Sequence, residues 1–269
     1  MKKTLIVAVA MALPVIAEAS PWLPIPGSTQ LSVGIVNQAG DEFYLGTEKV
    51  TLPDKIKQNT YSIGAHHGLT DQLAIDAQLN YARISFGTLS ESAIGDSSIG
   101  IKWRVFDEFE SSGTPTLTLR AAANIAGNYE VGKIDAIGDG ASGIELAALA
   151  GKYLLPNFTI AGELGYRYRN HDVPADIWVG ADVGYSMASF VSLSAGFTAT
   201  RSQGDLDIAG PGFTPARFPE LREDRDLVKI GAAFSISPRV SLNVNYAQVI
   251  SGRNTTKADI WGISVATSF

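Results

Sequence analysis

The chain has 269 residues, of which 18% are charged, 45% are hydrophobic and none is cysteine, and its formal net charge is −6. The charged fraction is low beside the roughly 25% of an ordinary soluble domain, and the apolar fraction excludes a disordered chain. A net negative charge argues against a general nucleic-acid binder. The lack of cysteine excludes disulfides, thiolate metal sites and a cysteine nucleophile.

Residues 1–19 have the pattern of a secretory signal peptide. Two lysines open the segment, a short uncharged apolar stretch follows, and Ala17 and Ala19 place small residues where signal peptidase cuts. The apolar stretch is shorter than the ~20 residues that a bilayer-spanning helix needs. We therefore expect cleavage before Ser20 and export of the remaining chain.

A proline-rich segment, residues 20–27, separates the signal peptide from the first predicted strand. Pro21, Pro24 and Pro26 each fix φ and remove a backbone donor, so this segment is stiff. It can fold into the interior of the domain that follows, as a plug, or it can remain a disordered leader. The lack of a polar anchor in its sequence favours the leader.

From residue 28 to the end, apolar and polar residues alternate with a period of two. The alternation is clearest over 116–125, 158–169, 191–200 and 240–246. Such a period predicts strands with one apolar and one polar face. A coarse placement gives twelve strands, at 28–46, 58–68, 72–86, 95–106, 115–128, 142–154, 158–169, 175–186, 190–202, 223–236, 239–251 and 256–269.

The connections between these strands alternate in length. Short, turn-like connections take turns with longer polar ones, which we expect over 48–58, 129–140 and 203–222. This alternation, an even strand number and the absence of a long apolar run are typical of outer-membrane barrels, which must satisfy every backbone group within the wall. The sequence therefore predicts a single all-β domain over 28–269, a 12-stranded antiparallel transmembrane β-barrel in a Gram-negative outer membrane.

The phase of the alternation assigns side chains to the two faces of this barrel. Aromatic residues of the lipid-facing phase gather at two heights, as expected of interfacial girdles. The charges that break the phase, among them Arg83, Lys152 and Asp259, lie near strand ends where they can reach lipid headgroups. The other charged side chains face the lumen, and those that we propose to line a solute pathway are Asp76, Lys102, Arg104, Arg120, Glu145, Glu163, Arg167, Arg169, Asp182 and Lys229.

The predicted lumen holds six basic and six acidic side chains, counting Asp96 and Asp176 with the residues just named, so it is nearly neutral. Barrels of about 8 strands are filled by side chains and those of about 16 hold a water channel, and twelve lies between. Two interpretations stay open. The opposed charges pair and fill the lumen, or they line a narrow polar path.

The C-terminus carries a specific motif. Trp261, Ile263 and Val265 alternate with small residues, and the chain ends on Phe269. This pattern resembles the C-terminal signal that the barrel-assembly machinery recognises in bacterial outer-membrane proteins. We therefore assign Phe269 as an assembly signal.

Three segments carry a resemblance to a known family. They are AIGDSSIGIKWR (93–104), SGIELAALAGKY (142–153) and GYRYR (165–169). They are similar to the outer-membrane transporter barrels grouped with the meta-pathway of phenol degradation. The resemblance implies uptake of small, apolar or aromatic compounds, and it carries over no ligand-binding residue.

Signals for catalysis and cofactors are sparse. The histidines are His66, His67 and His171, and no G-x-S-x-G motif occurs, so a barrel lipase is a weak alternative and we expect no enzyme activity and no cofactor. Asp135 and Asp139 suggest a calcium loop, but their spacing matches no known ligand loop and a solvated turn is favoured. We expect no metal.

The sequence thus predicts a passive channel or transporter for small, hydrophobic or aromatic solutes, surrounded by outer-membrane lipid and without a nucleic-acid partner. An alternative is a closed structural or adhesive barrel whose loops, above all 203–222, bind an external partner. The two differ in whether a continuous path crosses the barrel. The oligomeric state is not predicted.

Overall fold

The computed structural model describes residues 20–110, 113–133 and 135–269. The predicted signal peptide, 1–19, lies outside the described residues. No helix in the described ranges is long and apolar enough to cross a bilayer. The elements are β1 (Thr29–Leu45), β2 (Glu48–Gly68), β3 (Leu73–Phe86), β4 (Leu89–Ile94), β5 (Ser97–Phe106), β6 (Thr116–Ile125), β7 (Gly143–Leu155), β8 (Phe158–Arg169), β9 (Asp176–Ala188), β10 (Val191–Ser202), the 3-10 helix η1 (Pro215–Glu220), β11 (Asp224–Ser237), β12 (Val240–Arg253) and β13 (Thr256–Ser268).

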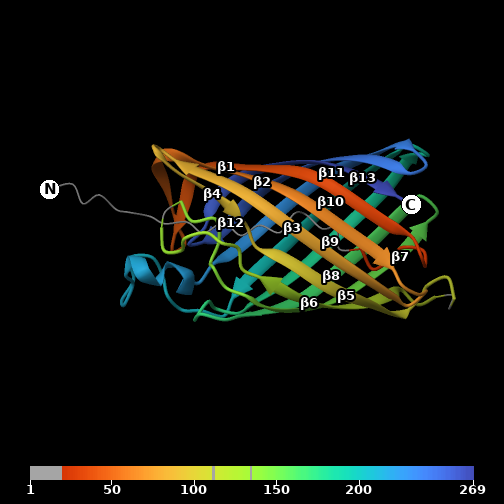
Figure 1. The fold of residues 1–269 in the computed structure, drawn as a ribbon, viewed down its shortest axis with the longest axis horizontal. Helices are drawn as coiled ribbons and strands as arrows, with labels where there is room; N and C mark the ends of the chain where they lie inside the picture. The colour runs from red at the N-terminus through yellow and green to blue at the C-terminus, as the bar shows by residue number, and fades with distance from the viewer. Residues whose placement is uncertain (1–19, 111–112, 134) are drawn as a thin grey trace.

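The strands form one antiparallel sheet that closes on itself (Figure 1). β1 pairs with β2 on one side and with β13 on the other, and a β2–β3 pairing completes the ring. β3 is the one strand with which β4 pairs in the described ranges. β4 pairs with residues 81–86 of β3, toward the end of that strand, and β5 pairs with residues 73–78. β4 and β5 thus follow the same edge of β3 in registers that differ by one residue, and they form one strand of the wall interrupted at Gly95 and Asp96. Counted in this way, the described residues build a wall of twelve strands, which confirms the predicted fold class.

The two ends of the barrel differ. One end, called the turn end here, carries the C-terminus, the start of β1 and the short connections 69–72, 156–157, 189–190 and 238–239. The opposite end, the loop end, carries the long connections 126–142 and 203–223. Figure 1 shows these connections gathered over one mouth of the barrel, away from the C-terminus.

The β1–β2 hairpin extends further than the sequence predicted. Residues 48–58, expected as a polar connection, are strand, and β2 runs for 21 residues. The pairing continues from Gly40 opposite Ile56, through an irregularity, to Leu45 opposite Glu48 at a turn where Gly46 has a φ of 57°. Leu52 and Ile56 are buried on the inner side of this hairpin, so packing against the loops, which a local pattern does not report, stabilises the extension.

The free edge of β4 is covered by the 126–142 connection. The backbone N–H of Ile94 donates to Asn128 Oδ1 at 3.0 Å, and the Asn128 N–H donates back to the Ile94 carbonyl at 3.1 Å. Two residues further along the connection, the Glu130 N–H donates to the Glu91 carboxylate at 2.9 Å. The connection therefore supplies hydrogen bonds along the edge of β4 that faces away from β3.

The wall has an apolar outer face and a polar inner face, as the alternation predicted. Leu79 and Ile230, for example, are 63% and 60% exposed on the outer face. Asp259, an out-of-phase charge, accepts hydrogen bonds from the Tyr246 hydroxyl at 2.7 Å and the Gln248 amide at 2.9 Å, both on the same outer face. The Asp259 carboxylate is therefore stabilised by hydrogen bonds from neighbouring side chains.

The main apolar core lies inside the mouth at the loop end. We call it the apolar cap, and it comprises Phe43, Leu52, Ile56, Ala82, Ile84, Ile137, Leu206, Ile208, Phe218 and Leu221. These side chains come from the inner faces of β1, β2 and β3 and from the 126–142 and 203–223 connections. The 203–222 connection, expected as a polar loop, thus turns its apolar side chains into the mouth.

Candidate functional site: the lumen

Arg120 is the centre of a polar network on the inner wall. It lies on β6, between Asp76 on β3 and Glu145 on β7. Its guanidinium donates to Asp76 Oδ1 at 2.6 Å and to Glu145 Oε1 at 2.5 Å, and its Nε reaches both oxygens of Asp76 at 3.1 and 3.2 Å. The three side chains are only 16 to 19% exposed. A bidentate guanidinium fork of this kind holds its partners in a fixed geometry.

A second ion pair joins strands that are not neighbours. Lys229 on β11 reaches Asp182 on β9, with Nζ to Oδ1 at 2.8 Å, and passes over β10 at Gly196. A Cβ at Gly196 would lie 2.6 Å from Lys229 Cε. The glycine is therefore needed for this pair to form against the wall.

A third set of charges, nearer the loop end, comes from β8, β9, the 126–142 connection and the start of β11. Arg167 and Arg169 on β8 each donate to Asp176 Oδ2 on β9 at 2.9 Å, and Arg169 also donates to Asp139 of the 126–142 connection at 2.7 Å. Glu223 and Arg225, at the start of β11, interact electrostatically with these groups. We call the six residues Asp139, Arg167, Arg169, Asp176, Glu223 and Arg225 the arginine cluster.

Two carboxyl groups of the arginine cluster lie outside the strands and are strongly perturbed. Burial raises the pKa of the Glu223 carboxyl well above its ordinary value, and the nearby Asp139 carboxylate adds to the effect. Burial likewise raises the pKa of Asp139, although the guanidinium of Arg169 opposes the shift. Both carboxyl groups therefore hold protons to a higher pH than exposed ones do.

The ten residues predicted to line a pathway all lie on inner-face positions of the wall, but they form separate groups. Arg120, Asp76 and Glu145 form the central network, Lys229 and Asp182 form a pair, and the two arginines of β8 join the arginine cluster. Arg104 pairs with Asp107 at 2.9 Å near the turn end. Glu163 lies over Gly180, and Lys102 has no hydrogen bond or ion pair with any described residue.

Sequence reasoning missed part of the arginine cluster. Asp139 was assigned to a solvated turn, and that expectation was wrong, because Asp135 to Ala141 is largely buried and Asp139 pairs with Arg169. Arg225 shares the phase of Lys229 four residues later, so the strand period alone places it on the inner face. The calcium alternative finds no support in the described ranges, where no three His, Asp or Glu side chains group as metal ligands.

The proline-rich segment closes part of the turn end. The Pro21 carbonyl accepts the Thr118 hydroxyl at 2.5 Å, and the Trp22 indole N–H donates to Glu108 Oε1 at 2.9 Å. The Trp22 ring also lies 5.1 Å from that of Tyr153. The expectation of a disordered leader was therefore wrong, because the indole N–H supplies the polar anchor that the sequence analysis did not identify.

At the loop end, Asn254 fixes three segments at once. It is fully buried and has a left-handed φ of 50°. Its Oδ1 accepts the backbone N–H of Gly46 at 3.0 Å and of Ile208 at 3.2 Å, and its Nδ2 donates to the Arg222 carbonyl and to Asp207 Oδ1, both at 2.8 Å. Both ends of the 203–222 connection are thus tied to the β1–β2 and β12–β13 turns.

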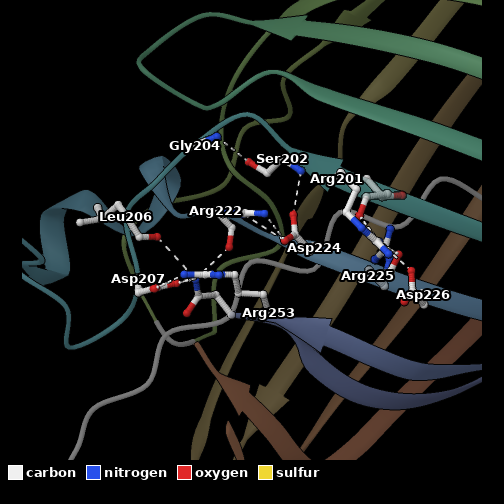
Figure 2. A network of polar contacts seen from close by, with 12 residues as sticks. Arg201, Ser202, Gly204, Leu206, Asp207, Arg222, Asp224, Arg225, Asp226 and Arg253 are labelled. Carbon is white, nitrogen blue, oxygen red and sulfur yellow. Dashed lines mark hydrogen bonds and ion pairs between the residues drawn. The ribbon is translucent and has the colours of Figure 1, made fainter. Parts of the chain in front are cut away.

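An ion pair between Arg253 and Asp207 strengthens this anchor (Figure 2). Arg253 donates to both oxygens of Asp207, at 2.5 and 2.7 Å. Its hydrogen bonds hold the pKa of the Asp207 carboxyl below the ordinary value. Arg222 and Asp224 form a further pair at 2.9 Å, and Asp224 accepts the Ser202 backbone N–H. The connection is therefore held as a folded lid over the mouth.

The histidines do not form a shared site. His66 lies on the inner face opposite Asp76, whereas the neighbouring His67 contacts the Thr29 hydroxyl at 2.8 Å through Nδ1. Adjacent strand residues point to opposite faces, so the two imidazoles are separated by the wall. The described part of the chain therefore offers no serine–histidine arrangement built on this pair.

The closed twelve-stranded wall, with its apolar exterior and charged interior, is the architecture of outer-membrane β-barrel proteins. The chain belongs to the family described as Putative MetA-pathway of phenol degradation, whose model matches residues 36–264. This finding confirms the resemblance seen in the sequence. No curated protein matches the chain.

Solved structures share the fold at low sequence identity. An outer membrane channel from Pseudomonas putida F1 matches with a TM-score of 0.74 and 17% identity, over 92% of this chain and 97% of that one. The NanC porin matches with a TM-score of 0.57 and 10% identity, over 88% and 98%. The translocator domain of the autotransporter NalP from Neisseria meningitidis matches with a TM-score of 0.54 and 14% identity, over 92% and 91%.

Proposed function

We propose that this chain is an outer-membrane channel for passive uptake of small, hydrophobic or amphiphilic solutes. The observation that carries the proposal is the apolar cap, in which Phe218, Leu206 and other side chains of the lid turn inward at the mouth. A polar pore for hydrophilic solutes has no need of such a surface. An apolar solute, in contrast, can replace the buried contacts of the cap when the lid moves.

The path has successive layers from the loop end to the turn end. A solute first meets the apolar cap, then the arginine cluster, then the inner wall with Arg120 and Lys229, and finally the segment 20–27. Around Arg120 and Lys229 the charges are paired along the wall, so this part of the lumen has no strong preference for one sign of ion. No energy-coupling element is part of this proposal, and passage is by diffusion.

The proposed location in the outer membrane follows from the predicted signal peptide, the barrel fold and the C-terminal motif. We expect the chain to be exported, cleaved before Ser20, inserted by the barrel-assembly machinery through Phe269, and surrounded by outer-membrane lipid. N-terminal sequencing of the protein from purified outer membranes tests the cleavage site directly.

We also propose that the chain is not an enzyme and needs no cofactor. Loss of hydrolytic activity on changing His66 would contradict that view.

Conductance of the refolded barrel in a planar bilayer tests the channel directly. We expect discrete steps, and we expect an Arg120→Ala, Arg167→Ala double variant to change their size, because it removes two lumen charges. An Arg83→Ala, Arg239→Ala double variant is the matched control, since both side chains are exposed and outside the lumen. A silent wild-type barrel that is folded and heat-modifiable on a gel would contradict the proposal and favour binding by the loops.

A further inference from the structure

The arginine cluster has hydrogen-bonding capacity that the described residues do not use. The Arg225 side chain, on the inner face of β11, has no hydrogen bond or ion pair with any described residue. Within the same cluster, Arg169 Nε is a buried donor that has no hydrogen-bond partner among the described residues. Buried polar atoms without partners are uncommon, and each one calls for an explanation such as a bound ligand.

The distribution of charge leaves one cation without a counter-ion. Asp176 accepts both Arg167 and Arg169, and Asp139 accepts Arg169 again, so two carboxylates serve the two arginines of β8. Glu223 is the remaining acid, and its burial favours the neutral form. A neutral Glu223 leaves the charge of Arg225 uncompensated. With Glu223 neutral, the cluster holds three guanidinium groups against the two carboxylates of Asp139 and Asp176, and the donors of Arg225 have no partner among the described residues.

The arginine cluster adjoins the apolar cap through two connections of the chain. Ile137, a member of the cap, is two residues before Asp139, and Leu221, another member, is two residues before Glu223. Both connections thus place an apolar side chain in the cap and, two residues later, an acid among the arginines. A molecule at this boundary meets an apolar surface on one side and a guanidinium on the other.

We propose that this boundary is a binding subsite for a small organic monoanion, a single carboxylate on an apolar body. The carboxylate would take the free donors of Arg225, in the two-bond geometry that guanidinium and carboxylate groups share. The apolar body would lie against Leu221 and the rest of the cap. A monoanion fits better than a dianion, because one positive charge is uncompensated and Asp176, Asp139 and Glu223 surround it.

This inference deepens the proposed function, since it names the class of solute that the lumen retains. Its test measures binding in detergent rather than passage, so the two fail independently. Benzoate is the probe, and benzyl alcohol, which has nearly the same shape and no charge, is its matched comparison. Equilibrium dialysis against the folded chain in micelles, with empty micelles subtracted, gives the affinity of each.

We expect benzoate to bind at least about tenfold more tightly than benzyl alcohol, and Arg225→Gln to remove that difference. Arg201→Gln is the control, because Arg201 is an exposed arginine of β10 that pairs with Asp226. Equal binding of the two probes by the wild-type chain would overturn the inference, whatever the variant does. Full retention of benzoate binding by a folded Arg225→Gln chain would overturn it as well.

Discussion

The indole N–H of Trp22 donates to Glu108 Oε1 at 2.9 Å, which ties the segment before the first strand to the β5–β6 connection 86 residues away. The Glu108 carboxylate is itself held by the Tyr153 backbone N–H, through Oε2, at 2.9 Å. A stiff proline-rich segment is therefore fixed near its start on one side of the turn end. This anchor decides how much of that opening is free.

We expect Trp22→Ala to raise the single-channel conductance of the refolded barrel. The substitution removes both the hydrogen bond to Glu108 and the ring contact with Tyr153, so the segment is released from the inner wall. Trp22→Phe retains a ring without the N–H and should give an intermediate effect. Trp103→Phe, on the outer face, is the control and should leave the conductance unchanged. Equal conductance of Trp22→Ala and wild type would mean that the segment does not obstruct the path.

We expect Asn254→Ala to free the lid formed by the 203–222 connection. The substitution leaves several buried backbone groups unpaired, at a cost of at least about 2 kcal/mol. Trypsin cleavage after Arg217, a lid residue, should become about thirtyfold faster if local opening limits the reaction. Asn254→Gly relieves the strain of the left-handed φ but also lacks the amide, so it should be cleaved nearly as fast. Asn157→Ala, in an exposed turn at the other end, should behave as wild type.

The ion selectivity of the lumen should depend on pH through Glu223. Because burial raises the pKa of this carboxyl, Glu223 stays neutral at pH values where an exposed glutamate is charged. As the pH rises through the raised pKa, Glu223 gains a negative charge beside Arg225, and the preference for anions should fall. Reversal potentials in a KCl gradient between about pH 5 and about pH 8 measure this shift.

Glu223→Gln is the decisive variant for this dependence, since its side chain is neutral at every pH. We expect it to keep the anion preference of the acidic condition throughout, with a much flatter profile than wild type. An unchanged profile in this variant would assign the titration to another group, of which Asp139 is the nearest with a raised pKa. The same recordings on Asp139→Asn separate the two.

We expect Phe269→Ala to reduce the amount of chain assembled in the outer membrane several-fold without lowering the yield of refolding in detergent. The Phe269 side chain is 64% exposed, whereas its backbone closes the barrel through hydrogen bonds with Thr29 at 2.8 and 3.0 Å. The substitution keeps those bonds and removes only the exposed ring. A parallel loss of refolding in vitro would show that the ring stabilises the barrel itself rather than its recognition.

Where the period of two was decisive, the sequence predicted the structure well. The inner-face positions of Arg120, Asp182 and Lys229 follow from parity alone, because a strand allows only two directions for a side chain. The same parity does not tell which charges meet. The contact of Asp76 with Arg120 depends on the pairing of β3 with β5 and of β5 with β6, which is a property of register across the sheet.

The parts that could not be predicted have no regular period. Leu206, Phe218 and Leu221 are isolated apolar residues in a polar connection, and only the folded mouth brings them together with Phe43. The N-terminal segment failed for a similar reason, since Trp22 meets its partner through a contact distant in sequence. A local sequence pattern indicates which face of a strand is buried. These residues are instead buried by contacts with segments that are distant in the sequence.

The hydrogen bonds between Asn128 and Ile94 also affect how neighbouring copies of this chain meet. A bare strand edge is a template on which another strand can add. Here the edge of β4 is already occupied by the chain's own connection, at 3.0 and 3.1 Å. Even at high density in one membrane, this end of β4 is therefore already paired, and it offers a strand of an adjacent barrel no bare edge at Ile94.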